Sequence, residues 1–272
     1  MIGRVKGTSR NLAVGGAALL ALVTFACGPA LYEIPIETPI SAKLDVTAFQ
    51  RVLVAGFVAG GTEDVDTNQE TVRLLRSQLR TKSSLRVIDA DVMPLQDIAQ
   101  DQNKAATEVN DATISTANPS TQPTALPQHI KDEKDLEPYE RLFANTTYWK
   151  RIGEEYQNPL IVTGTVLFIP RTSARFVQRE TEVYDGLGRR RVVPVRTYVE
   201  SKGFLLKPKF IFIDGRTGAT IYSETRREEV LTNAQTNVPA LSSYFELMDR
   251  IVPDFLGALS TQKVKGTRVL LK

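Results

Sequence analysis

The run Pro159–Ile169 (PLIVTGTVLFI) constrains the fold more than any other stretch of the sequence. Its early part is continuously apolar, which is typical of a central strand buried on both faces. A second short apolar run, Arg51–Val58, is bounded by Gly60 and Gly61 and has the same character. The two runs predict an α/β fold in which a mixed central sheet is flanked by helices.

Helical patterns lie between and after these strands. The segment Thr67–Glu70 (TNQE) has the pattern of a capping box, and the helix that follows it carries Val72, Leu75 and Leu79 on one face. With a short strand at Ser84–Asp89, residues 51–89 predict a strand–helix–strand unit. Aromatic residues from 136 to 152 predict a second helix with a break around 145–147. A third is expected from about Leu241 to Leu259, and a terminal run, 268–271, could add an edge strand.

Residues 171–230 have the pattern of antiparallel strands. The polar, β-rich runs Arg175–Tyr184 and Arg191–Glu200 are joined by Asp185–Gly188, whose glycines suit a hairpin loop. A hairpin inserted in a membrane would show an outward apolar band along about ten alternating residues per strand. Only a partial band occurs, at Val193, Val195 and Thr197. We therefore expect a water-exposed antiparallel arm at 171–200, with edges on which a partner could pair.

The first 26 residues have the pattern of a signal peptide. Arg4, Lys6 and Arg10 precede a wholly apolar stretch, Leu12–Val23, and a small residue, Ala26, precedes the expected cleavage point. A membrane-spanning helix needs about 20 apolar residues, so a permanent anchor helix is the weaker interpretation. The sequence predicts export and removal of residues 1–26.

Cys27 is the only cysteine of the chain and follows the apolar stretch directly. Ala26-Cys27-Gly28 resembles the bacterial lipobox, which implies that Cys27 is acylated and becomes the mature N-terminus, held on a membrane by its acyl chains. Two other interpretations stand beside this one: cleavage after Ala26 with a free thiol, and Cys27 as an apolar filler. Gly28, where an aspartate would retain the protein at the inner membrane, favours the outer membrane.

The rest of the chain predicts a tether, a domain and an insertion. Residues 27–50 have no helical period and predict a lipid anchor followed by an extended tether. Residues 51–272 predict a single α/β periplasmic domain. Within it, residues from about 100 to 134 are rich in polar side chains and alanine and predict a disordered insertion, which contains the only histidine, His129.

Charge argues against a nucleic-acid partner. Three of the 34 Lys and Arg residues lie in the leader, so the mature chain balances its 31 Asp and Glu residues with an equal number of bases. Such a chain lacks the basic footprint of a nucleic-acid-binding protein. The cluster Arg189–Arg191 is interpreted as a solvated hairpin end.

Catalytic chemistry has little support in the sequence. A histidine base would have to be His129, and a zinc site of histidines and cysteines is not available. Asp64 and Asp66 lack the spacing of a calcium loop, and Gly60-Gly61 is followed by neither a Walker nor a Rossmann pattern. Asp89 and Asp91 follow a strand end, where α/β active sites form, but capping or loop roles are commoner. We expect no catalytic residue, no cofactor and no bound metal.

The order of elements resembles a family of envelope proteins. The segments Arg51–Phe57, Leu160–Val166 (LIVTGTV) and Phe210–Gly218 (FIFIDGRTG) together are similar to the periplasmic domain shared by the curli secretion lipoprotein CsgG, the penicillin-binding-protein activator LpoB and the TolB N-terminal domain. The resemblance covers most of 51–260 apart from the insertion. It implies a mixed sheet flanked by helices and a non-enzymatic, membrane-tethered module that acts through protein contacts.

The sequence thus predicts a lipid-anchored binding or assembly component of the bacterial envelope that faces the periplasm. It would contact the membrane through its N-terminal lipid and an envelope protein that the sequence does not identify, and it could form a homo-oligomer. One alternative is a subunit of an oligomeric outer-membrane secretion pore, as the resemblance to CsgG implies. A second, less supported alternative is an envelope hydrolase that would use Asp89 or Asp91 in a deep pocket.

Overall fold

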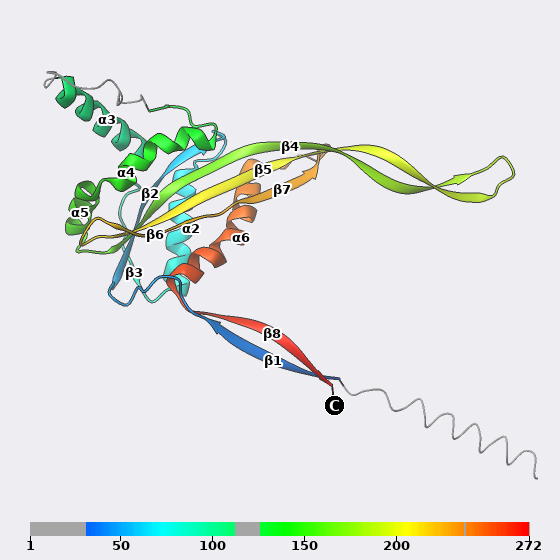
Figure 1. The fold of residues 1–272 in the computed structure, drawn as a ribbon, viewed down its shortest axis with the longest axis horizontal. Coiled ribbons are helices and arrows are strands. Elements are labelled where there is room, and N and C mark those ends of the chain that lie inside the picture. The colour runs from blue at the N-terminus through cyan, green and yellow to red at the C-terminus, as the bar shows by residue number, and fades with distance from the viewer. Residues whose placement is uncertain (1–30, 112–125, 237, 272) are drawn as a thin grey trace, which may run out of the picture. The chain divides into compact units, whose positions relative to one another are not determined.

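A computed structural model describes residues 31–111, 126–236 and 238–271 of the chain (Figure 1). The chain forms two compact units. The larger, residues 41–260, contains a mixed sheet and all the described helices, and is called the body. The smaller consists, in its described part, of residues 31–40 and 261–271 and is called the ribbon.

The body is built on a six-stranded sheet in the order β3-β2-β4-β5-β6, with β7 also paired to β5. Its strands are β2 (Arg51–Gly61), β3 (Arg86–Val87), β4 (Leu160–Tyr184), β5 (Arg190–Asp214), β6 (Thr220–Thr225) and β7 (Glu228–Asn233). β3 and β4 run parallel to β2, whereas β5 is antiparallel to β4, β6 and β7. The predicted fold class, a mixed central sheet flanked by helices with an antiparallel arm, is confirmed.

Helices cover both faces of this sheet. One core contains residues of α2 (Thr67–Lys82) and α6 (Ala240–Leu259); the other contains residues of α3 (Leu95–Asp111), η1 (Glu133–Tyr139), α4 (Glu140–Ala144) and α5 (Thr146–Glu155). Successive strand residues alternate between the cores: Val52 and Val54 pack in the first, and Leu53 and Ala55 in the second. This double burial explains why the run at 51–58 is continuously apolar rather than alternating.

The start of α2 differs by one residue from the predicted capping box. Asp66, not Thr67, is the N-cap, and its carboxylate accepts a hydrogen bond from the Gln69 N–H at 3.0 Å. Thr67 is instead the first residue of the helix, and it is buried. An aspartate caps a helix as well as a threonine does, and the polar loop before α2 made it available. The predicted break in the aromatic helix is confirmed at Asn145, which caps α5 by accepting from the Tyr148 N–H at 3.1 Å.

Strand β2 has a bulge between Val54 and Gly56, where its register against β4 shifts. A bulge leaves backbone groups outside the regular ladder, and buried groups of this kind need other partners. Side chains supply them: Asn68 Oδ1 accepts from the Phe57 N–H at 2.8 Å, Arg76 donates to the Val54 carbonyl at 2.8 Å, and the Thr163 hydroxyl donates to the Gly56 carbonyl at 2.9 Å. Helix α2 is thereby fixed to the central strand.

Strands β4 and β5 are much longer than the runs that the sequence suggested. Each has 25 residues, and they pair continuously from Leu160 opposite Asp214 to Tyr184 opposite Arg190. The predicted separate runs are thus the inner and outer halves of two long strands. The end of the predicted antiparallel region forms two short strands, because β6 and β7 pair with successive parts of β5 on either side of Arg226 and Arg227.

The predicted disordered insertion at 100–134 is wrong for its two ends. Residues 100–111 belong to α3, whose Leu95 and Ala99 are buried against the second core. Ile130 is buried as well, and the Gly61 N–H donates to its carbonyl at 2.8 Å. A few well-spaced apolar side chains therefore order these polar segments. Residues 112–125 lie outside the described residues.

The ribbon was not predicted. β1 (Leu31–Ile40) pairs antiparallel with β8 (Gln262–Leu271), from Leu31 opposite Leu271 to Ile40 opposite Gln262. The boundaries of the predicted tether (27–50) and domain (51–272) are corrected: residues 31–40 form a strand, 41–50 belong to the body, and 261–271 belong to the ribbon. The predicted edge strand at 268–271 is part of β8. Pro35 and Pro39 are tolerated in β1 because an edge strand needs only alternate N–H groups for pairing.

Candidate functional site

The outer halves of β4 and β5 form the arm, residues 171–200 (Figure 1). Strand β2 pairs with β4 only as far as Phe168, and β7 pairs with β5 only from Ser201 inward. Within the described residues, each arm strand is therefore paired on one side alone, except that the Glu200 carbonyl at the base of the arm accepts from the Ala234 N–H at 3.0 Å. The arm offers two free strand edges, one on each side, to a partner.

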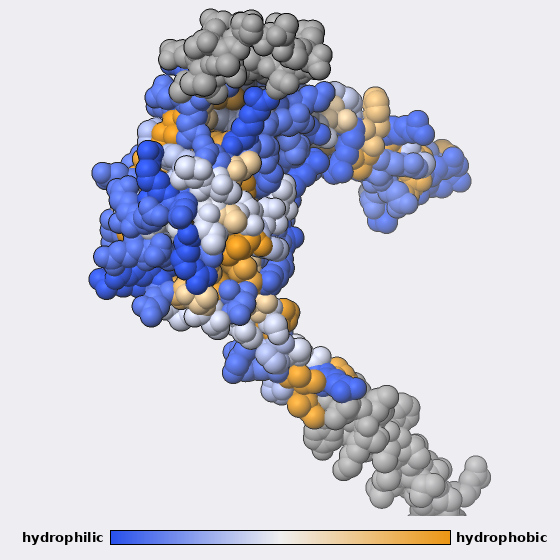
Figure 2. Space-filling model, turned by 60° about the vertical axis from the view of Figure 1, so that its left-hand side comes forward, coloured by the Kyte–Doolittle hydropathy of each residue, from blue (hydrophilic) through white to orange (hydrophobic). Residues whose placement is uncertain are grey.

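Its side chains divide into two exposed faces, because paired residues of an antiparallel ladder share a face. The valine–arginine face consists of Arg175, Val177, Arg179, Thr181, Val183, Arg191, Val193, Val195, Thr197 and Val199. The glutamate–tyrosine face consists of Phe176, Gln178, Glu180, Glu182, Tyr184, Arg190, Val192, Pro194, Arg196 and Tyr198. Over residues 175–184 and 190–199, the first face has three guanidinium groups and no carboxylate. Figure 2 shows the arm as a mainly blue, hydrophilic surface with separate orange side chains.

Contacts within the glutamate–tyrosine face are local. The rings of Phe176 and Tyr198 meet edge to face with centroids 5.4 Å apart, yet their side chains remain 73% and 58% exposed. Arg190 lies 3.0 Å from Glu182. Large aromatic side chains in water are typical anchors of protein interfaces, because their burial by a partner releases much ordered water.

The tip of the arm is an ordered loop. Asp185 Oδ1 accepts from the Leu187 N–H at 3.0 Å and from the Arg189 N–H at 2.8 Å, and Gly188 adopts a positive φ of 73°. The backbone hydrogen bond from Arg189 lowers the pKa of Asp185 most. Arg189 and Arg190 are thus paired with acids, as expected of a hairpin end, and Leu187 is left 78% exposed at the tip.

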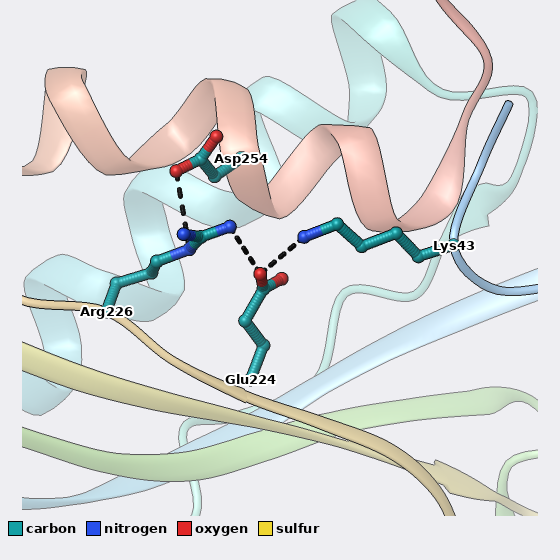
Figure 3. Close-up of polar contacts among 4 residues, drawn as sticks. All are labelled: Lys43, Glu224, Arg226 and Asp254. Atoms are coloured by element: carbon teal, nitrogen blue, oxygen red, sulfur yellow. Dashed lines mark hydrogen bonds and ion pairs between the residues drawn. The ribbon is translucent and has the colours of Figure 1, made fainter. Parts of the chain in front are cut away.

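A second polar cluster fastens the beginning of the body (Figure 3). Glu224 Oε1 on β6 accepts from Lys43 Nζ at 2.5 Å and from the Arg226 guanidinium, and Arg226 Nε lies 3.3 Å from Asp254 on α6. The bond to Glu224 raises the pKa of Lys43. Glu224 is only 12% exposed, so these ion pairs are largely shielded from water. Through them, segment 41–50 is fixed to the sheet, and the sheet to α6. No sequence signal pointed to it, since its members are distant in the chain.

The sequence's candidates for catalysis are not brought together. Asp89 is 74% exposed and forms an ion pair with Arg80, and Asp91 lines none of the three described cavities. His129 is also exposed, with Nε2 3.8 Å from Glu63. In the part of the chain that the structure describes, no group of three His, Cys, Asp or Glu residues could hold a metal ion.

A cleft of about 420 Å³ lies at the carboxyl end of β2. The two parallel neighbours of β2, β3 and β4, lie on opposite sides of it, so the chain connections there run in opposite directions. Ligands of open α/β sheets bind at such points. Here, however, Asp66 already caps α2, and Glu63 adds a second carboxylate, so the helix end is unsuited to an anion. A larger cavity of about 890 Å³ between α3 and the η1–α4 segment is lined mainly by amide and apolar side chains.

Cys27, the predicted lipidation site, lies outside the described residues. Among the described helices, none combines the length and the apolar character needed to cross a membrane.

Comparisons with known proteins give structural matches only. No protein-family model and no curated protein matches the chain. PelC, a dodecamer from Paraburkholderia phytofirmans, is 12% identical, with a TM-score of 0.35 over 86% of this chain and 100% of that one. The lipoprotein GNA1162 from Neisseria meningitidis is 10% identical, with a TM-score of 0.32 over 75% and 96%. At these values the matches assign neither family nor function, and the resemblance to CsgG, LpoB and TolB stays a prediction.

Proposed function

We propose that this chain is an exported lipoprotein, acylated at Cys27, that serves as a non-enzymatic binding or assembly component of the bacterial envelope. Its body would face the periplasm from the outer membrane, and its arm would bind an envelope protein. The leader and the lone cysteine support the anchor, and the arm supports the binding role.

The arm is the observation that carries the proposal. A two-stranded hairpin with no core beneath it is marginally stable in water. This arm nevertheless continues the central sheet outward with exposed aromatic rings at Phe176, Tyr184 and Tyr198. A partner strand added to either edge would complete the hydrogen bonding of the ladder, and its own side chains would pack beside these rings on the same face. The arm is therefore suited to β-strand addition.

An oligomeric pore is the second candidate, because the arm has two free edges that run antiparallel to each other. The β4 edge of one copy could pair with the β5 edge of the next, giving a head-to-tail assembly that closes into a ring. Charge argues against insertion of such a sheet into lipid. Arg175, Arg179 and Arg191 lie on one face and Glu180 and Glu182 on the other, and an arginine at the bilayer midplane costs about 2–4 kcal/mol.

The binding role is tested by shortening the arm. Arg175 and Val199 are directly opposite in the ladder, so residues 176–198 can be replaced by Asn-Gly, a two-residue turn that keeps the register. The native mass of the membrane-extracted complex in mild detergent is then compared with that of the full chain. We expect the shortened variant to reach the membrane but to lose the partner or the other copies.

The matched control is Leu187→Ser, which changes an exposed tip residue and leaves both edges intact. It should keep the complex. A complex of unchanged mass in the shortened variant would show that the arm does not hold the partner. A large complex that contains this chain alone, lost on shortening, would favour the oligomeric alternative.

The anchor is tested independently. Cys27→Ser should abolish incorporation of radiolabelled fatty acid and release the folded protein from the membrane fraction. Acylation that persists in this variant contradicts the assignment of Cys27. A protein that stays unlabelled in both forms contradicts the lipoprotein proposal as a whole.

A further inference from the structure

One face of the ribbon carries a row of isoleucines, and the other carries Glu33, Glu37, Lys263 and Lys265 beside the exposed Val269. Ile34, Ile36 and Ile40 of β1 occupy alternate positions and therefore share a face, and they are 44%, 37% and 54% exposed. Within the described residues of the ribbon, no side chain of β1 is buried. In Figure 2, orange hydrophobic surface lies along this part of the chain beside blue hydrophilic surface.

Charged residues are segregated between the two faces. Arg268 lies opposite Ile34 in the ladder and shares the isoleucine face. No Asp or Glu stands at the positions of this face that the structure describes. Glu33 and Glu37 stand on the opposite face with Lys263 and Lys265, and Lys263 Nζ lies 3.5 Å from Glu37. The isoleucine face is thus apolar with a basic group, and the other face balances its charges.

Such a ribbon requires a partner surface that removes its isoleucines from water. Two strands alone do not bury enough surface to be stable in water, and a row of exposed isoleucines adds to that deficit. The position of β1 in the sequence, close to Cys27, indicates what this surface is. Leu31 follows Cys27 by four residues, which span at most about 14 Å when fully extended. If Cys27 is acylated, β1 begins within that distance of the lipid headgroups.

We propose that the ribbon lies on the lipid surface, with its isoleucine face at the boundary between headgroups and acyl chains and Arg268 at a lipid phosphate. The proposal rests on the lipid anchor at Cys27. The anchor also explains why three isoleucines suffice: it holds the ribbon at the surface, so docking is intramolecular and needs little affinity of its own. Glu33 and Glu37 would face the water.

A second copy of the ribbon is a poorer occupant. Two isoleucine faces packed together would bury both Arg268 guanidinium groups without a carboxylate on either face to pair with them. Burial of an unpaired charge is strongly unfavourable. A lipid phosphate supplies the missing anion and lets the isoleucines leave water at the same time.

The test compares two neighbouring residues of β1 that point to opposite faces. Ile36→Cys and Glu37→Cys variants of the full, lipidated chain are labelled with an environment-sensitive fluorophore and reconstituted into vesicles of phosphatidylethanolamine and phosphatidylglycerol. Nitroxide-bearing lipids then quench any label at the acyl boundary. The unsubstituted chain, treated alike, checks that acylated Cys27 takes up no label. Flotation of the vesicles reports the anchor separately.

We expect several-fold stronger quenching at position 36 than at 37, and a loss of that contrast when Arg268→Glu is added. Flotation with equal, weak quenching at both positions overturns the ribbon proposal and leaves the anchor intact. A chain that does not float overturns both. A label at position 36 could instead become shielded from solvent in detergent as the protein concentration rises, and stay unquenched in vesicles. That result would identify a second copy of the ribbon as the occupant and would also overturn the proposal.

Discussion

Asp214 is the last residue of β5, and its carboxylate stabilises the turn that follows this strand. Arg216 donates to both of its carboxylate oxygens, each at 3.0 Å, and the Arg216 guanidinium also lies 5.1 Å from the ring centroid of Phe49. Burial raises the pKa of Asp214, but the hydrogen bonds from Arg216 outweigh it, and the net pKa is lowered. A carboxyl with a lowered folded-state pKa stabilises the protein above its unfolded pKa, and this stabilisation is lost as pH falls through the folded pKa.

We therefore expect Asp214→Asn to lower the free energy of unfolding by about 1–2 kcal/mol at neutral pH, since it removes a charge-assisted pair. The difference between the variant and the unsubstituted protein should shrink in acid, as pH falls through the lowered folded-state pKa of Asp214 and the native carboxyl becomes protonated. Urea unfolding at neutral pH and in acid measures this difference in the free energy of unfolding. An equal difference at both would mean that Asp214 acts through packing and not through its charge.

Tyr244 gives a residue-scale prediction that does not depend on a charge pair. Its buried hydroxyl lies 2.6 Å from the Thr71 hydroxyl and joins α6 to α2. Tyr244→Phe should cost about 1 kcal/mol, the net value of a buried hydrogen bond, as read from denaturant midpoints. Tyr222→Phe, at a half-buried position on β6, is the control and should change little. Burial also raises the pKa of Tyr244, so its contribution to stability should be lost as pH rises from the ordinary tyrosine pKa of about 10 towards the raised folded-state pKa.

Single residues were the least predictable part of the molecule. The cap of α2 was misplaced by one position because Asp66 and Thr67 are both good caps, and only the geometry of the preceding loop decides between them. The cluster of Lys43, Glu224 and Arg226 could not be predicted, since ordinary charged residues carry no sign of a contact made across 181 positions. Asp89 and Asp91 could be recognised as weak candidates for catalysis because no other catalytic group accompanies them.

Among the elements, the bulge of β2 gives the sharpest prediction. Asn68 on α2 provides the acceptor for the N–H of Phe57, the residue that directly follows the bulge in β2. Asn68→Ala should destabilise the protein by about 1–3 kcal/mol, the cost of leaving a buried donor unpaired. Ser77→Ala, at an exposed position on the same helix, should stay within about 0.5 kcal/mol. Equal effects of the two would refute the role of Asn68 at the bulge.

Elements with a strong apolar pattern were predictable from the sequence, and those held by pairing alone were not. The runs at 51–58 and 159–169 and the face of α6 each mark a buried surface, which periodicity shows directly. The continuity of β4 and β5 through residues 170–175 has no such signal, because both faces are polar there and only the ladder holds the strands. The ribbon was missed for the same reason: β1 and β8 are paired at opposite ends of the chain.

At the scale of the whole molecule, β4 joins two regions of different stability. Its inner half, 160–168, lies between β2 and β5 with side chains in both cores, whereas its outer half, 175–184, is paired with β5 alone and exposed. Amides of the inner half can exchange with solvent only when the body unfolds, but those of the outer half need only a local opening. One strand should therefore show a steep gradient of hydrogen exchange along its length.

We expect exchange in 175–184 to be about 100-fold faster or more than in 160–168 for the purified protein, as measured on peptides by mass spectrometry. The same arm peptides should become protected when the protein is extracted together with its partner, because an added strand closes the free edge. The peptides of α6 serve as an internal control and should not change. Uniform slow exchange along the whole of β4 in the isolated protein would mean that the arm is stable by itself, and its exposed edges would then no longer argue for a partner.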